Sequence, residues 1–303
     1  MITAKFGPAG NCDAFYASGR KATLQAPEWL REIGLDAYEF QAGNGLRVSD
    51  ATLTAIGNQA REHGIAMSLH TPYFISLSGV DPEKRLKSIT YIKDSLHAAS
   101  LLGADIIVIH TGSAAKISRE EALGLAADTL YKTLEEIGDQ PIRLGLETMG
   151  KVNQLGTLEE VIALCKIDPI ICPVVDWGHL NARAVGGQFP DADAYRRVFF
   201  SIGEALGDSY AKNLHCHFSK IEYTTGGEKK HLTFADTVYG PDFEPVIDLV
   251  VQKNCFFKQY KKSRLHYFWN NHNNPTKINE AYERRKKFIC LSFCFIYFSF
   301  FGL

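Results

Sequence analysis

Short apolar runs alternate with amphipathic stretches along residues 1–254 of the chain. Each apolar run has the length of a buried strand, and each amphipathic stretch has the length and periodicity of a helix that packs on a sheet. Such βαβα alternation is typical of a parallel sheet with helices on its outer side. It constrains the fold more than any single residue does, and it predicts an α/β protein.

The alternation can be divided into seven strand–helix units. Strands are predicted over residues 3–6, 37–41, 66–70, 105–110, 143–147, 170–176 and 213–218. The clearest helix has Asp81 as its N-cap, Pro82 in its first turn and Gly103 as its terminator. The other helices are predicted over residues 27–33, 49–63, 118–137, 158–166, 192–206 and 243–253.

The number of units favours a TIM-type (β/α)8 barrel, a fold that commonly needs about 250 residues. An open, doubly wound sheet is the alternative. That fold would place a glycine-rich turn after the first strand and an acidic residue about 20 residues further on. The segment Gly7-Pro8-Ala9-Gly10 does not match this pattern, so the barrel is favoured.

The composition changes after residue 254, where an eighth strand should follow. Residues 255–287 are rich in aromatic, basic and asparagine residues, and residues 288–303 are almost wholly apolar. At 16 residues, this last run is shorter than the usual membrane-spanning helix. We therefore predict a metal-binding barrel domain over residues 1–254 and an aberrant, out-of-frame tail over residues 255–303, with the eighth strand missing or replaced.

Charge and cysteine usage restrict the function classes. The formal net charge is −1, so any contact with nucleic acid must come from a local patch or a metal cluster. The seven cysteines are scattered without CxxC pairs, which is typical of reduced thiols. The N-terminus has no basic segment followed by an apolar stretch. These features indicate a cytoplasmic protein that does not associate with a membrane.

Polar side chains recur at the predicted carboxyl ends of strands, which is where barrel enzymes build their active sites. In chain order they are His70, His110, Glu147, Asp176, His179, His215, Glu228 and His231. Taken singly, each has an ordinary alternative, because a histidine can simply be hydrogen-bonded and a carboxylate can cap the next helix. Together they would desolvate one another unless cations neutralised them.

Imidazole nitrogens and carboxylate oxygens are the ligands that Zn²⁺ and related divalent ions prefer. Eight such groups exceed the four that one tetrahedral zinc takes. The residues therefore predict two or three metals that share bridging carboxylates, an arrangement suited to phosphoryl chemistry. The sequence contains no GxxxxGK[ST] phosphate loop, no GxSxG elbow and no HExxH motif that would favour another chemistry.

The ordered set of motifs resembles the endonuclease IV family (AP endonuclease family 2) of the xylose-isomerase-like barrels. The segments that carry the resemblance are His70–Leu77 (HTPYFISL), Ile109–Gly112 (IHTG), Gly145–Thr148 (GLET), Asp176–Ala182 (DWGHLNA), His215–Lys220 (HCHFSK) and Glu228–His231 (EKKH). The most specific of them is the Asp-x-x-His-x-x-Ala pattern at residues 176–182. The resemblance extends in order from about residue 1 to residue 254.

The resemblance implies a hydrolase for damaged DNA. It implies up to three zinc ions, with Mn²⁺ as the alternative, in a monomeric enzyme that cleaves double-stranded DNA on the 5′ side of abasic sites during base excision repair. His70 and His110 would hold one metal with Glu147, the central catalytic residue, which would bridge to a second metal. Asp176 and His215 would serve that second metal.

The third metal and the DNA contact follow from the same resemblance. His179, His231 and Glu228 would hold the third metal, and Tyr73 would be inserted into the DNA beside the abasic site. An ordinary loop tyrosine is the alternative for Tyr73. His217 lies two residues from His215 and faces the same side of the strand, so it is a further candidate ligand outside the set that the resemblance implies.

The sequence departs from the family in three places. Ser76 stands where the family usually has asparagine, and the last motif is Glu-x-x-His at residues 228–231 in place of Asp-x-His. The family also takes a bridging glutamate from its eighth strand, for which this chain offers no candidate. Activity of the chain as written is therefore in doubt.

Two other functions remain open. A sugar isomerase or epimerase of the xylose-isomerase-like barrels would also place Glu, Asp and His around divalent metals, but with one or two metals and fewer histidines. An inactive, truncated relative would lack a complete site. The metal content of the purified protein would distinguish these possibilities from a nuclease with three metals.

Overall fold

A computed structural model describes residues 3–246, 249, 296–297 and 300–301 of the chain. Its centre is a six-stranded parallel sheet whose strands are neighbours in chain order. They are β3 (Ala37–Gln41), β4 (Ala66–His70), β5 (Ala104–His110), β6 (Arg143–Glu147), β7 (Ile171–Asp176) and β8 (His215–His217). The sheet curves as part of a barrel wall, so the predicted TIM-barrel-like fold is confirmed; among the described residues the parallel sheet is open between β8 and β3.

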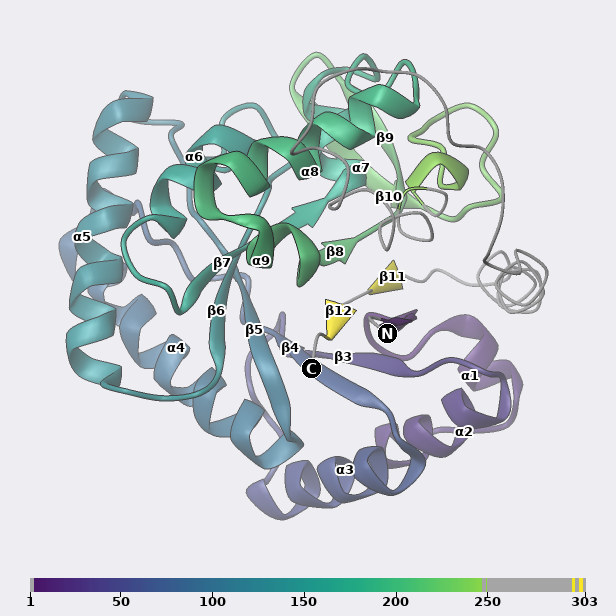
Figure 1. Ribbon diagram of the computed structural model, residues 1–303. Helices are drawn as coiled ribbons and strands as arrows, with labels where there is room; N and C mark the ends of the chain where they lie inside the picture. The colour runs from purple at the N-terminus through teal and green to yellow at the C-terminus, as the bar shows by residue number, and fades with distance from the viewer. Residues whose placement is uncertain (1–2, 247–248, 250–295, 298–299, 302–303) are drawn as a thin grey trace.

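The central strands are apolar because they are covered on both faces. Ile106, Ile107, Val108 and Ile109 of β5 are all fully buried. Figure 1 shows α3, α4 and α5 ranged around the outer side of the strands. The larger helices are α2 (Ala26–Glu32), α3 (Asp50–His63), α4 (Pro82–Leu102), α5 (Arg119–Ile137), α6 (Leu158–Cys165), α7 (Trp177–Arg183) and α8 (Ala192–Leu206).

Local signals fix the helix ends. The Asp81 side chain accepts hydrogen bonds from the backbone N–H groups of Glu83 and Lys84 at the start of α4. Gly103 ends the same helix with φ 69°, a left-handed conformation that glycine adopts without strain. The predicted bounds of α4 are therefore confirmed. Shorter helical segments lie at α1 (Asp13–Ala17), η1 (Thr23–Gln25) and α9 (Asp208–Lys212).

Two predicted strands are shorter than expected. In place of a strand over residues 3–6, the structure has β1 (Thr3–Ala4) and β2 (Gly7–Pro8). The strand is interrupted between β1 and β2. There the backbone N–H of Phe6 donates a 2.6 Å hydrogen bond to the Asp36 carboxylate, which lies just before β3. The strand predicted over residues 213–218 is reduced to the three residues of β8. Most of the helix predicted over residues 243–253 lies outside the described residues.

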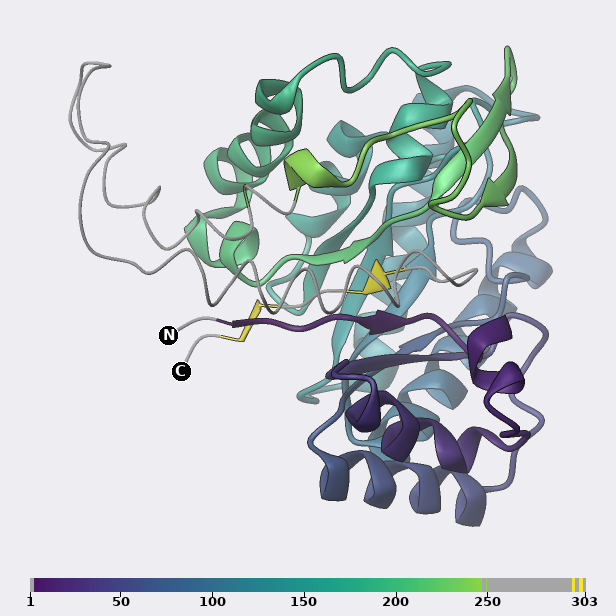
Figure 2. The same ribbon diagram turned by 90° about the vertical axis from the view of Figure 1, so that its right-hand side faces the viewer.

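Two short strands border the opening of the sheet. Ala9 forms a parallel bridge with Glu39, so the chain after β2 runs beside β3. Strand β11 (Ile296–Tyr297) pairs with β2 and also lies against β8, and β12 (Phe300–Phe301) pairs with β1; both pairings are antiparallel. Figure 2 shows these two segments beside the N-terminal strand. The described residues thus contain antiparallel segments where an eighth parallel strand was expected, and residues 255–295 lie outside them.

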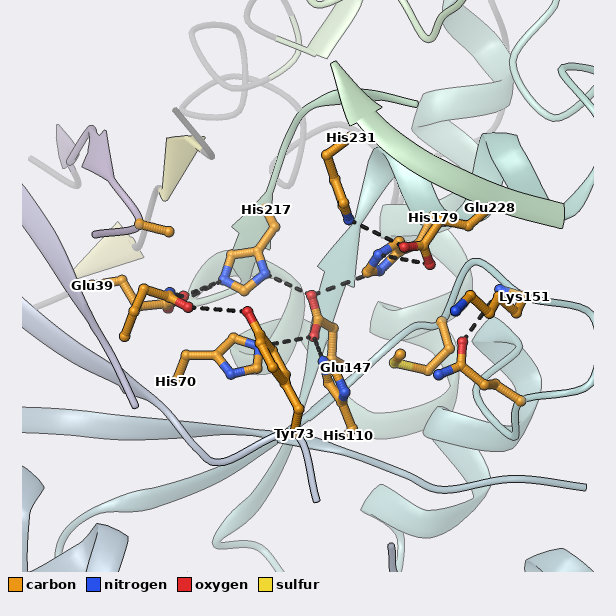
Figure 3. A pocket seen from close by; sticks show the side chains of 14 residues that line it. Glu39, His70, Tyr73, His110, Glu147, Lys151, His179, His217, Glu228 and His231 are labelled. Atoms are coloured by element: carbon orange, nitrogen blue, oxygen red, sulfur yellow. Dashed lines mark hydrogen bonds and ion pairs between the residues drawn. The ribbon is translucent and has the colours of Figure 1, made fainter. Parts of the chain in front are cut away.

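A hairpin projects from the end of β8. It consists of β9 (Lys220–Thr224) and β10 (Gly227–Leu232), which pair in antiparallel fashion. It brings Glu228 and His231 to the carboxyl ends of the parallel strands, where the histidines of the sheet also lie (Figure 3). Within the described residues, no helix is long and apolar enough to cross a membrane.

Candidate metal centre

A pocket of about 400 Å³ lies at the carboxyl ends of the parallel strands. Its lining includes Glu39, His70, Tyr73, His110, Glu147, Lys151, His179, His217, Glu228 and His231 (Figure 3). The pocket is therefore where the sequence expects the active site of a barrel enzyme. The candidate ligands fall into four groups of three residues whose ligand atoms lie within 4.8 Å of one another.

The first group contains His70, His110 and Glu147, from the ends of β4, β5 and β6. The Glu147 Oε2 atom lies 3.0 Å from His110 Nε2 and 3.4 Å from His70 Nε2. The other nitrogen of His70 is 2.9 Å from the carbonyl oxygen of Thr71, which orients the ring. These three residues are brought together as the sequence predicts.

Glu147 is 1% exposed, and burial by itself would raise the pKa of its carboxyl group. The charge of His217, its hydrogen bond to Oε1 and the nearby nitrogens of His110 and His70 outweigh burial and hold that pKa well below its usual value. Glu147 is therefore a buried carboxylate surrounded by imidazoles.

The group nearest the hairpin contains His179, Glu228 and His231. The Glu228 carboxylate lies 3.4 Å from the Nε2 atoms of both histidines. In each ring the Nδ1 atom has another partner, since His179 Nδ1 is 2.9 Å from the Thr148 carbonyl and His231 Nδ1 is 2.8 Å from the Ser219 hydroxyl. Burial alone would raise the pKa of Glu228, but the nearby His231 and His179 have the larger, opposite effect and lower this pKa to about 2.

Asp176 belongs to a group with Glu147 and His179. Its Oδ1 atom accepts a hydrogen bond of 2.7 Å from the backbone N–H of His179, so it caps the short helix α7. Its Oδ2 atom is buried and accepts no hydrogen bond from any residue that the structure describes. Asp176 thus serves as a helix cap through one oxygen and leaves the other available to a cation.

The fourth group contains Glu39, His215 and His217, and Glu39 is not among the ligands predicted from the sequence. Glu39 is fully buried on β3 and lies 3.0 Å from His215 Nε2. His217, not His215, reaches Glu147, at 2.6 Å. The expected pairing of Asp176 with His215 is not among the four groups. The signal that could have found Glu39 is its position as the one charged residue in the strand Ala-Tyr-Glu-Phe-Gln.

The donor set fits divalent metal ions. It consists of buried and half-buried imidazole nitrogens and carboxylate oxygens, which are ligands of zinc and related ions. A buried Asp176 oxygen without a hydrogen bond also matches a site that a cation would satisfy. Several of these buried groups could therefore hold metal ions.

Tyr73 stands at the mouth of the pocket with 54% of its surface exposed. Its ring stacks on His110 with the centroids 5.3 Å apart. Its hydroxyl is 3.4 Å from Gln41 Oε1, and partial burial raises its pKa to about 12. An aromatic ring that is both held at the rim and exposed can contact a ligand larger than the pocket.

A loop over residues 149–156 forms another part of the rim. Arg183 of α7 donates hydrogen bonds of 2.8–3.2 Å to four of its carbonyl oxygens. The loop carries Lys151 into the pocket lining, and the Gly150 carbonyl accepts a 3.0 Å hydrogen bond from the backbone N–H of Glu228. By holding this loop, Arg183 positions Lys151 and also the backbone of the candidate ligand Glu228.

Comparison with known proteins places these residues in a known superfamily. The sequence profile described as "xylose isomerase-like TIM barrel" matches residues 27–262. A protein of Methanocaldococcus jannaschii, described as uncharacterized, is 28% identical over 69% of this chain and 76% of its own length. A probable endonuclease 4 of Acholeplasma laidlawii is 33% identical over 54% of this chain and 56% of its own length. The matched part of this chain therefore spans little more than half of the Acholeplasma relative.

Solved structures share the fold at lower identity. Endonuclease IV from Thermus thermophilus superposes with a TM-score of 0.57 at 22% identity, over 77% of this chain and 83% of that one. A 3-keto-D-glucoside 4-epimerase from E. coli superposes with a TM-score of 0.59 at 13% identity, over 92% of this chain and 98% of that one. Nucleases and sugar epimerases thus share this barrel, and the fold alone does not separate them.

Proposed function

The chain belongs to the xylose isomerase-like TIM barrel family, and from that premise we propose that it is a zinc-dependent phosphodiesterase that cleaves double-stranded DNA on the 5′ side of abasic sites. The observation that carries the proposal is the number of ligand groups around one pocket. Four groups of buried and half-buried histidines and carboxylates lie in or next to it, and Glu147 and His179 each belong to two of them. That inventory suits two or three neighbouring cations, the arrangement used in phosphoryl transfer.

Sequence similarity supports the same chemistry. The Acholeplasma laidlawii relative at 33% identity is named a probable endonuclease 4, and a Schizosaccharomyces pombe relative at 26% identity is named an apurinic-apyrimidinic endonuclease. The substrate is carried over from these names and from the motif order.

The chain's own residues would divide the work in a definite way. Bound divalent metals would polarise a phosphate oxygen and lower the pKa of a water molecule. Glu147 lies where two ligand groups meet and would set the distance between their cations. Lys151 at the rim would contact a DNA phosphate, and the exposed ring of Tyr73 would stack in the space left by the missing base.

A cleavage assay tests the proposal. The full chain, loaded with zinc, is incubated with a labelled duplex that carries one tetrahydrofuran abasic-site analogue. We expect a single cut on the 5′ side of the analogue, which leaves a 3′-hydroxyl that a DNA polymerase extends. Chelation with EDTA should stop the reaction, and an intact duplex should remain uncut.

A sugar epimerase is the competing function, and it rests on the shared fold alone. The zinc-loaded and manganese-loaded chain is therefore also incubated with ketohexoses. Epimerisation of a sugar without cleavage of the abasic duplex, at full metal content, would reject the nuclease and favour the epimerase.

A further inference from the structure

Three buried residues, Glu39, His215 and His217, join the two edges of the open sheet, and we call them the edge cluster. Glu39 projects from β3, and both histidines project from β8; these are the first and last strands of the six-stranded sheet. The strands are not hydrogen-bonded to each other, yet their side chains meet at 3.0 Å. We propose that the edge cluster holds a divalent cation of the zinc class that links the two edges of the sheet. This inference deepens the proposed function and rests on it, since His217 contacts Glu147 in the same pocket.

The edge cluster has the burial and orientation of a ligand set. Glu39 and His215 are fully buried, and His217 is 1% exposed. His215 and His217 are two residues apart, so both point to the same side of β8. The Glu39 carboxylate is oriented from behind, because Ser68 Oγ donates to its Oε2 at 2.9 Å and Gln41 Nε2 donates to its Oε1 at 3.1 Å.

Hydrogen-bond stoichiometry favours a cation in this place. His217 lies between two carboxylates, with Nδ1 2.6 Å from Glu147 and Nε2 3.0 Å from Glu39. A neutral imidazole carries one N–H and can donate to only one of them. The arrangement therefore needs either one more proton, on the imidazole or on a carboxyl group, or a metal ion that takes one of the carboxylates. A metal ion also neutralises more of the buried negative charge of Glu39 and Glu147 than one proton does.

Because the edge cluster joins two distant strands, a cation bound there would also affect the stability of the fold. A bond from Glu39 to the metal and from the metal to β8 would connect strands that are 176 residues apart in the chain. Ligands that are assembled only in the folded state couple metal binding to stability. Part of the stabilisation by zinc should therefore depend on Glu39.

The first experiment counts metal in matched variants of the full chain. Glu39→Gln removes a cluster carboxylate, and Glu136→Gln makes the same change on α5, where the side chain is half exposed and paired with Lys93. After loading with zinc and gel filtration, E39Q should carry one zinc fewer per chain than wild type, and E136Q should match wild type. EDTA should lower the Tm of E39Q by less than it lowers the Tm of wild type or E136Q.

The same experiment can also overturn the proposal. If E39Q retains the zinc content of wild type and the same EDTA-induced fall in Tm, the edge cluster is an ion-pair network held by a proton, and the proposal is wrong. If E39Q does not fold, crystals of the unmodified chain grown with zinc provide a second test. An anomalous zinc peak at about 2.2 Å from the Glu39 carboxylate supports the proposal, and zinc peaks confined to the other groups overturn it.

These measurements separate the inference from the proposed function. Zinc at the edge cluster in a chain that does not cut abasic-site DNA would keep the inference and reject the nuclease. Cleavage of abasic-site DNA by a chain with no zinc beside Glu39 would do the reverse.

Discussion

At the scale of single residues, Glu147 links most of the centre. Its carboxylate lies within 3.7 Å of nitrogen atoms of His70, His110, His179 and His217. Its Oε2 atom faces the histidines of β4 and β5, and its Oε1 atom faces His217. A carboxylate in this position can serve two cations at once.

We expect Glu147→Gln to abolish cleavage of an abasic-site duplex. The change would remove the negative charge that we propose lies between two cations, and it leaves the side-chain volume nearly unchanged. The loss should exceed tenfold, which corresponds to more than about 1.4 kcal/mol of barrier. Single-turnover cleavage and zinc content measure the effect in E147Q and in its unsubstituted parent, both with a restored C-terminus. A variant that keeps more than about a tenth of the activity would remove Glu147 from its assigned role.

Tyr73 is the residue for which the sequence leaves two readings open, a DNA contact or an ordinary rim tyrosine. Its exposed ring stacks on His110, so it is held in place without being buried. Tyr73→Ala should weaken binding of the abasic duplex by about 1–3 kcal/mol, the range for stacking of one base on an aromatic ring. Tyr73→Phe keeps the ring and should bind nearly as well as wild type. Fluorescence anisotropy with labelled duplex compares the three proteins, and equal affinities of Ala and Phe variants would favour the ordinary rim tyrosine.

At the scale of elements, helix α7 and the loop over residues 149–156 position the group nearest the hairpin. Asp176 caps α7, and His179 lies in the first turn of this helix. Arg183 in its last turn donates to four carbonyls of the loop, and the loop in turn accepts a hydrogen bond from Glu228. Helix α7 therefore orients His179 directly, and it orients Glu228 through the loop that Arg183 holds.

Arg183→Gln should loosen the loop and weaken metal binding at the His179, Glu228 and His231 group. Loss of residues that orient metal ligands typically costs about 10–100-fold in metal affinity. Zinc affinity measured by chelator competition, together with amide hydrogen exchange of residues 149–156, tests this. Arg61→Gln is the control, because Arg61 lies on α3 and donates to the side chain of Asn58. Unchanged exchange in the loop of R183Q would show that other contacts hold it.

At the scale of the whole molecule, the parallel sheet stops at β8, and the described residues contain no parallel strand between β8 and β3. Strand β11 lies at this edge in the antiparallel direction. In a closed barrel every strand edge is paired, which removes the edges that otherwise promote aggregation. Among the described residues, six parallel strands of the barrel are therefore hydrogen-bonded in one sheet, two fewer than a (β/α)8 barrel contains.

We propose that residues 255–303 arise from a change of reading frame and that residues 1–254 form the barrel domain. Another frame of the gene near codon 254 should then encode an apolar strand that ends in glutamate, followed by a helix. The chain as written should aggregate more readily than the restored chain and bind less zinc. DNA sequence around codon 254 and zinc content of both chains test this. A monomeric, fully metallated chain as written, with no such segment in any frame, would contradict it.

The sequence by itself determined the βα alternation, the barrel-like fold and most of the candidate ligands. These follow from short-range patterns, since an apolar run sets each strand and the residue at its end is carried to a common edge. The tertiary structure alone decided which ligands meet. Glu39 and His215 lie 176 residues apart and come within 3.0 Å only because the curved sheet brings β3 near β8. It also decided that His217, not His215, reaches Glu147, because the direction of each ring depends on how β8 sits against β7.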